Sequence, residues 1–133
     1  MAKLNEDVKK VISQTKTFPV STASKEGVPN VIPFAFVKCY GDDALLLADN
    51  FMQKSIANLE ENPQMAICVW DSENKQAYQI KGEVTILKSG NVFDETIKWV
   101  QGVLSQLTPK TALLMKVTHV YVCQPGPDIG REL

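Results

Sequence analysis

The chain has 133 residues, a formal net charge of -1 and 44% hydrophobic residues. This length and hydrophobic content predict one globular domain with a buried core and leave little room for a second domain. The balanced charge offers no basic face of the kind that nucleic-acid-binding proteins present. No apolar run approaches the length of a membrane span, and the N-terminus lacks the apolar core of a signal peptide, so we expect a cytoplasmic protein.

The N-terminal half predicts a helix, three strands and a second helix, in that order. The first helix has an apolar face, which consists of Leu4, Val8, Val11 and Ile12. Asn5 is its expected N-cap. Strands are expected in three segments separated by turn signals: residues 18–24, 28–38 and 44–48. The second helix is expected at 53–61 and stops before Pro63, because a residue that precedes proline avoids helical angles.

The C-terminal half predicts two strands, a longer helix and a sixth strand. These strands are expected at residues 65–70, 77–87 and 113–123. Gly82 lies inside one of them and indicates a bulge or a close approach of another backbone. The helix is expected to begin at a cap on Asn91, and its apolar face consists of Phe93, Ile97, Val100, Leu104 and Leu107. Tight turns between strands favour antiparallel pairing in a closed or partly closed barrel. The domain is expected to span 1–123, followed by a tail at 124–133.

Residues for side-chain catalysis or metal binding are scarce. The only histidine is His119, in the last expected strand, where a structural role is favoured over a catalytic one. The three cysteines are odd in number and never at CxxC spacing, which favours buried reduced thiols over a zinc site. Nucleophile-elbow, P-loop and dinucleotide-fingerprint patterns do not occur. We therefore assign no catalytic residue and no metal ligand.

The segment after the third strand can hold an anion. A buried strand ends at Ala48, the chain loops, and a helix begins near Lys54 and Ser55. Backbone N–H groups at a helix start favour an anion, Lys54 adds a positive charge, and the Ser55 hydroxyl can donate to a phosphate oxygen. On this local chemistry alone, an ordinary capped helix with a solvated lysine remains the favoured interpretation.

Three segments together resemble one known family. Residues 22–33 combine small residues, a polar turn with Gly27-Val28-Pro29 and an apolar strand. Residues 47–63 combine a strand end, a loop, Lys54-Ser55, a helix and Asn62-Pro63, and residues 79–84 form a glycine-bearing strand. In this order and spacing the segments resemble the pyridoxamine 5′-phosphate oxidase-like, FMN-binding split-barrel family.

That resemblance implies a fold, a cofactor and a site. The implied fold is a six-stranded antiparallel split β-barrel with flanking helices, and the implied cofactor is FMN, bound at the interface of a homodimer. Lys54 and Ser55 would meet the phosphate, with Asn58 one helical turn further on. The ribityl chain and ring would be lined by Ala48 and Asp49. The second strand would place four residues beside the isoalloxazine: Val31, Ile32, Pro33 and Phe34.

The chain departs from the family's full-length oxidases in ways that bear on activity. It lacks their C-terminal extension, and its only arginine is Arg131. In the stretch 33–38, Lys38 is the only basic residue. It is therefore more similar to the short flavin-nucleotide-binding members than to enzymes that oxidise pyridoxamine phosphate. We expect a small redox protein or reductase that passes electrons or hydride through FMN to a small molecule or protein. Three alternatives stay open: a deazaflavin-binding barrel, a haem-binding barrel that uses His119, and a non-enzymatic barrel without a cofactor.

Overall fold

The computed structural model describes residues 2–133 and contains three helices and seven strands in those residues. The helices are α1 (Glu6–Gln14), α2 (Lys54–Glu61) and α3 (Asn91–Val103). The strands are β1 (Phe18–Ala23), β2 (Pro29–Phe34), β3 (Val37–Cys39), β4 (Ala44–Asp49), β5 (Gln64–Asp71), β6 (Gln76–Leu87) and β7 (Thr111–Val122). Apart from one divided strand, the elements follow the predicted order.

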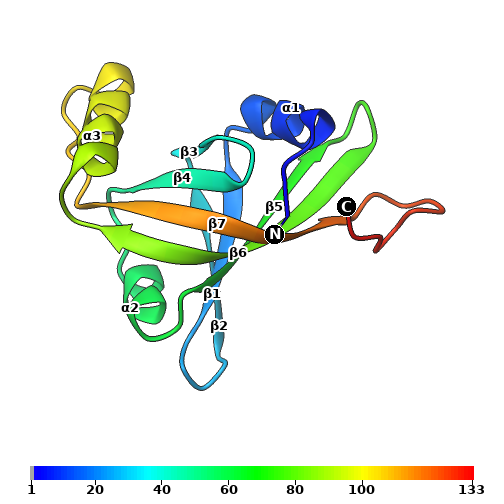
Figure 1. The fold of residues 1–133 in the computed structure, drawn as a ribbon, viewed down its shortest axis with the longest axis horizontal. Coiled ribbons are helices and arrows are strands. Elements are labelled where there is room, and N and C mark those ends of the chain that lie inside the picture. Colours follow the sequence, from blue (N-terminus) through cyan, green and yellow to red (C-terminus); the bar gives the residue numbers. More distant parts are fainter. Residues whose placement is uncertain (1) are drawn as a thin grey trace.

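The strands form one antiparallel sheet in the order β2-β1-β5-β6-β7-β4-β3. The two edge strands, β2 and β3, are consecutive in the sequence and are joined by only Ala35 and Phe36. This short connection brings the two edges together, so the sheet curls into a partly closed barrel with the helices around it (Figure 1). The predicted class, a mainly β split barrel with flanking helices, is confirmed.

The expected single strand at 28–38 is wrong, because the chain changes partners within it. Phe34 at the end of β2 pairs with Phe18 of β1, whereas Val37 at the start of β3 pairs with Leu47 of β4. Ala35 and Phe36 span the change of partner, which gives seven strands in place of six. Apolar patterning reports which side chains are buried, but it does not report which strand supplies the hydrogen bonds.

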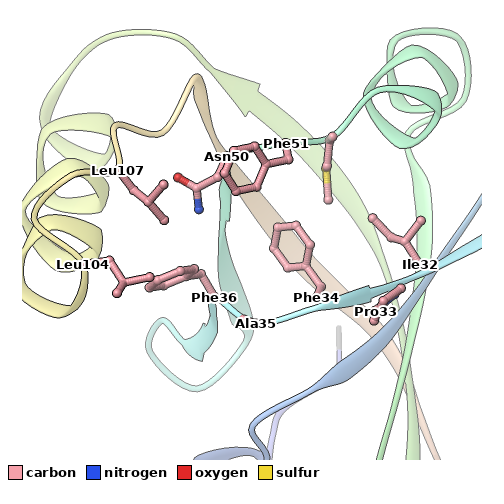
Figure 2. Close-up of a pocket in the computed structure, with 10 residues that line it drawn as sticks. Ile32, Pro33, Phe34, Ala35, Phe36, Asn50, Phe51, Leu104 and Leu107 are labelled. Atoms are coloured by element: carbon pink, nitrogen blue, oxygen red, sulfur yellow. The ribbon is translucent and has the colours of Figure 1, made fainter.

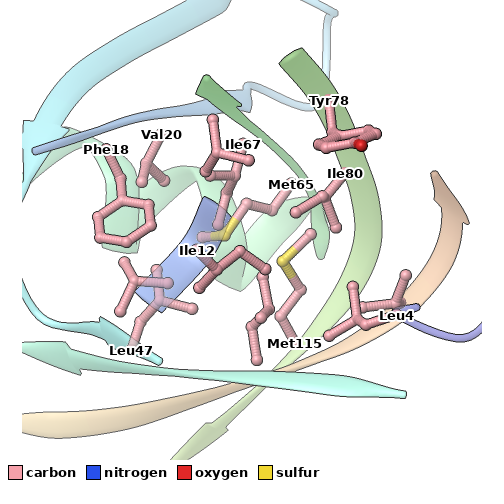
Figure 3. Packing of buried hydrophobic residues seen from close by; sticks show 14 of the residues in the cluster. Leu4, Ile12, Phe18, Val20, Leu47, Met65, Ile67, Tyr78, Ile80 and Met115 are labelled. Atoms are coloured by element: carbon pink, nitrogen blue, oxygen red, sulfur yellow. The ribbon is translucent and has the colours of Figure 1, made fainter. Parts of the chain in front are cut away.

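The core fills the inside of the curled sheet (Figure 3). Helix α1 packs on this core through Val8, Val11 and Ile12, each no more than 2% exposed. As predicted, Asn5 caps α1, and its side-chain oxygen accepts a hydrogen bond of 2.9 Å from the backbone N–H of Val8. The burial of the apolar face therefore fixes α1 against the sheet, and the cap fixes where the helix starts.

Gly82 marks an irregularity between β6 and β7, as its position in the sequence indicated. The register shifts between Lys81 and Gly82, and a Cβ atom added at Gly82 would lie 2.3 Å from the backbone oxygen of Lys116. Only glycine lets the two backbones approach this closely.

Two C-terminal expectations need correction. Helix α3 ends at Val103 instead of continuing through Leu107, and it is preceded by Gly90 at φ 97°, without a side-chain cap from Asn91. The expected tail folds back on β7, since the backbone N–H of Leu133 donates to Val120 over 2.8 Å. None of the helices in residues 2–133 combines the length and hydropathy needed to cross a bilayer.

Candidate functional site

An apolar pocket of about 470 Å³ opens where the two sheet edges meet (Figure 2). Its walls come from the end of β2 and the link to β3, from the loop after β4, and from the segment after α3. The lining residues are Ile32, Pro33, Phe34, Ala35, Phe36, Asn50, Phe51, Met52, Leu104 and Leu107. A space of this size with mainly apolar walls is typical of a site for a small molecule or cofactor.

An aromatic contact fixes the pocket residue Phe36 against α3. The Phe36 ring packs edge-on against Trp99 of α3, with 5.6 Å between ring centroids. Figure 2 shows Phe34 and Phe36 directed toward the same space from the β2–β3 link. Phe51 lies at the mouth and is 75% exposed, more than any other large apolar side chain in the described part of the chain. An exposed aromatic at a pocket mouth is available to cover a bound ring or to meet another protein surface.

Asn50 is the one polar side chain among the ten residues that line the pocket. Its Oδ1 atom is buried and has no hydrogen-bond partner within residues 2–133. Buried polar atoms in folded proteins are nearly always paired, so this oxygen is a group whose partner is an ordered water, a ligand or a second chain.

The start of α2 follows directly from the loop that lines the pocket. Met52 contributes to the lining, Gln53 occupies the N-cap position without a side-chain cap, and Lys54 is the first helical residue. Lys54 is exposed and forms no salt bridge with other described residues. Uncapped N–H groups beside an unpaired lysine provide the elements of an anion site next to the apolar pocket.

Asp49 shapes the loop between β4 and α2. Its carboxylate accepts a hydrogen bond of 2.9 Å from the Met52 backbone N–H and another of 2.9 Å from the Thr111 hydroxyl. The Lys110 ammonium lies 3.9 Å from this carboxylate and donates to the Met52 carbonyl over 2.8 Å. The Asp49 side chain is only 1% exposed, so this carboxyl group is held inside the protein beside the Lys110 ammonium.

The structure brings together only part of the residue set that the family resemblance implied. Ile32, Pro33 and Phe34 line the pocket, as that resemblance implied for the ring-binding strand. Val31 is not among the lining residues and is 64% exposed, whereas Ala48 is fully buried in β4.

Ser55 and Asn58 of α2 hold the helix against the first hairpin. Ser55 is buried, with 1% of its surface exposed. Its hydroxyl oxygen accepts a hydrogen bond of 3.1 Å from the Asn30 amide. Asn58 donates to the Thr22 hydroxyl over 3.1 Å. Ser55 accepts in this contact, so its own O–H is free to donate to another group.

A second depression adjoins the pocket and is basic. The two share Ala35 and Phe36, and three lysines, Lys9, Lys16 and Lys38, line the second depression. The Lys38 ammonium lies 4.5 Å from the centroid of the Trp99 ring, within cation–π range. The ion pair with Asp42 raises the pKa of Lys9, which keeps this ammonium charged.

The histidine and cysteines lie outside the pocket lining. His119 is 48% exposed on its side chain, and its Nε2 lies 3.9 Å from the Glu132 carboxylate. The three cysteines are unpaired, as predicted, but half-buried, and burial raises the pKa of the Cys39 and Cys68 thiols. No cluster of histidine, cysteine and carboxylate groups suited to a metal ion occurs in residues 2–133.

The sequence prediction missed several of the residues that line the pocket. The helical spacing predicts Leu104 and Leu107 on the apolar face of the helix, whereas the structure places them in the segment after it. Asn50 and Phe51 directly follow a fully buried strand, and this polar-aromatic pair in a loop was the available signal.

Comparison with known sequences identifies the family. The sequence model of the family described as pyridoxamine 5′-phosphate oxidase matches residues 4–124, so the chain belongs to this family. A protein of Methanocaldococcus jannaschii, itself described as uncharacterized, is 33% identical over 133 residues, which covers 98% of this chain and 88% of the relative.

Solved structures share the same fold at lower identity. HupZ of Group A Streptococcus is 23% identical with a TM-score of 0.83, over 96% of this chain and 99% of HupZ. An FMN-binding protein from Syntrophomonas wolfei is 19% identical with a TM-score of 0.77, over 89% and 84%. HutZ, the heme storage protein of Vibrio cholerae, is 18% identical with a TM-score of 0.69, over 91% and 95%.

Proposed function

We propose that this protein binds FMN, with the isoalloxazine ring in the apolar pocket and the phosphate at the start of α2 beside Lys54. The observation that carries the proposal is the direct continuity between the two features: the loop that lines the pocket leads into the uncapped helix start. An apolar space beside an anion site matches a ligand with an aromatic head and a phosphate tail.

The residues present fit this group. Nine of the ten lining side chains are apolar, which suits a planar ring, and the tenth is an amide that can pair with a polar ring edge. The Asp49 carboxylate would repel a phosphate if it were free, but hydrogen bonds from Thr111 and the Met52 backbone hold it inside the protein, and the Lys110 ammonium offsets its charge. Lys54 therefore presents its charge without competition from that carboxylate.

When bound, FMN would supply electron or hydride transfer, and the protein would supply binding and position. The lining of the pocket contains no acidic or basic side chain, so none of the ten residues would act as a general acid or base. Their contribution would be to hold the ring and to exclude water from it. This division of labour fits a small redox protein or reductase.

The site would be completed by a second copy of the chain. Every residue of β2 is exposed or half-exposed, and this edge strand carries apolar side chains toward solvent. Val28 and Val31 are 63% and 64% exposed, and Phe51, which lines the pocket, is 75% exposed. Exposed apolar groups along an unpaired strand edge mark an interface, which supports the homodimer expected from the family.

Titration of the purified protein with FMN and with riboflavin, followed by flavin fluorescence, tests the proposal. FMN should bind more tightly than riboflavin, because the phosphate adds contacts that riboflavin lacks. Binding should also bring the visible absorption of an enclosed flavin. If neither flavin binds while hemin does, the haem alternative replaces this proposal.

A deazaflavin is the second candidate, and one observation favours it. The basic depression beside the pocket carries Lys9, Lys16 and Lys38, which suit a cofactor that needs more basic residues along its groove than FMN does. Haem has less support from the pocket, since His119 is not among its lining residues. Competition between FMN and a deazaflavin cofactor for the same protein would decide between the two candidates.

A further inference from the structure

We propose that Asn50 selects the ligand of the apolar pocket by pairing its side-chain amide with a ligand edge that carries adjacent C=O and N–H groups. This inference rests on the proposed function and adds to it the chemical feature that the pocket recognises. The pyrimidinedione ring of flavins and deazaflavins carries such an edge, and haem does not.

The setting of Asn50 leaves the amide without a role inside the chain. Asn50 is half-buried as a residue, and its Oδ1 atom is buried without a partner among the described residues. It does not cap α2, because Gln53 holds the N-cap position. A buried amide oxygen without a partner destabilises the folded chain relative to an apolar side chain of the same size, so its presence calls for an explanation.

The backbone around Asn50 is held in place. Asp49, the preceding residue, is anchored by Thr111 and accepts a hydrogen bond from the Met52 N–H, which closes the loop around Asn50. The amide therefore stands at a fixed position in the pocket wall (Figure 2). Rotation about the Cβ–Cγ bond of asparagine is soft, so either end of the amide can turn toward the ligand.

An amide in this setting discriminates strongly. In an apolar pocket, the amide loses water and gains nothing unless the ligand offers both a donor and an acceptor. A ligand whose N–H is blocked leaves the amide oxygen unpaired. A mismatch of this kind at one buried hydrogen bond corresponds to about a 5-fold to 150-fold loss of affinity.

The test compares lumiflavin with N3-methyl-lumiflavin, two ring systems without a phosphate. The wild-type protein should bind lumiflavin at least about fivefold more tightly than its N3-methyl derivative. The Asn50→Leu variant should bind both with equal affinity, and its melting temperature without ligand should equal or exceed that of the wild type. Asn91→Leu, an exposed asparagine outside the pocket lining, is the matched control and should keep the preference.

Asn50→Asp gives a second variant that keeps the size of the side chain. It removes the N–H donor and should also lose most of the affinity for lumiflavin. A wild type that does not distinguish the two ring systems, or an Asn50→Leu variant that keeps the preference, would overturn the assignment of Asn50. If the wild-type protein bound neither lumiflavin nor FMN, the proposed function itself would fail.

Discussion

At the scale of single residues, Lys54 and Asp49 show how one loop separates opposite charges. The Asp49 carboxylate points into the protein and is satisfied there, whereas Lys54 stands exposed at the helix start. Asp49 thus shapes the loop, whereas Lys54, five residues further along the chain, is available to a ligand.

Lys54→Ala should weaken FMN binding by about 1.5–3 kcal/mol, because a charge-assisted hydrogen bond to the phosphate is lost. Riboflavin, which lacks the phosphate, should bind the variant and the wild type equally well. Lys98→Ala removes an exposed lysine on α3 and serves as the control. Fluorescence titration measures all of these affinities, and an unchanged FMN affinity would mean that the phosphate lies elsewhere.

The pair of Lys9 and Asp42 predicts a pH-dependent contribution to stability. Their hydrogen-bonded ion pair lowers the pKa of Asp42 below 3.8 and raises the pKa of Lys9 above 10.5. The contribution of Asp42 is present above its ordinary pKa and is lost as the pH falls through the lowered pKa. The contribution of Lys9 is present below its ordinary pKa and is lost as the pH rises through the raised one.

Asp42→Asn should therefore melt at a lower temperature than the wild type between about pH 5 and 9, and the difference should shrink toward pH 2. Thermal denaturation followed by circular dichroism across this range measures it. Asp128→Asn, which removes an exposed acid that contacts Arg131 in the C-terminal segment, is a control for general charge effects. A difference that is constant with pH would contradict the ion-pair explanation.

Among the elements, the close approach of the paired strands β6 and β7 depends on Gly82. Gly82→Ala should destabilise the fold by about 1–3 kcal/mol, because the added Cβ would meet the Lys116 backbone oxygen at 2.3 Å. Gly102→Ala lies in α3 with no atom within 4 Å of the added Cβ, and it should stabilise by about 0.5–1 kcal/mol. Urea denaturation of both variants gives the two values, and equal effects would contradict the steric argument.

Sequence patterns located nearly every element but could not define the pocket. The cap at Asn5, the bulge at Gly82 and the helix beginning at Lys54 follow from local chemistry that a sequence displays. The division of the strand at Ala35–Phe36 depends on two different pairing partners, which no local pattern contains. Leu104 and Leu107 keep helical spacing after α3 has ended, so their place in the pocket wall was also hidden.

At the scale of the whole molecule, the fold class was predictable because antiparallel hairpins leave few ways to arrange the strands. The location of the charge-bearing groups was less predictable, since it depends on contacts between distant segments. Thr111 is 62 positions from Asp49, and their hydrogen bond decides that this carboxylate faces inward. Long-range pairs of this kind are the part of a site that a sequence conceals.

Assembly can be tested through the exposed edge of β2. Val31→Lys should shift the protein from dimer toward monomer, because a charge would be buried at the proposed interface. Val103→Lys is a close match as a control, since both valines are 64% exposed and only Val31 lies on β2. Sedimentation velocity measures the two distributions, and a wild type that stays monomeric at high concentration would contradict the dimer.

The partly closed barrel has one weak line, where β2 and β3 meet without pairing to each other. The pocket lies along this line, because its lining residues 32–36 form the end of β2 and the link to β3. A ligand bound there would contact the end of β2 and the link to β3, and would so connect two edge strands that are otherwise joined only by Ala35 and Phe36. Amide hydrogen–deuterium exchange should then slow in β2 and β3 when flavin is added, while exchange in the central strands β5 and β6 stays the same.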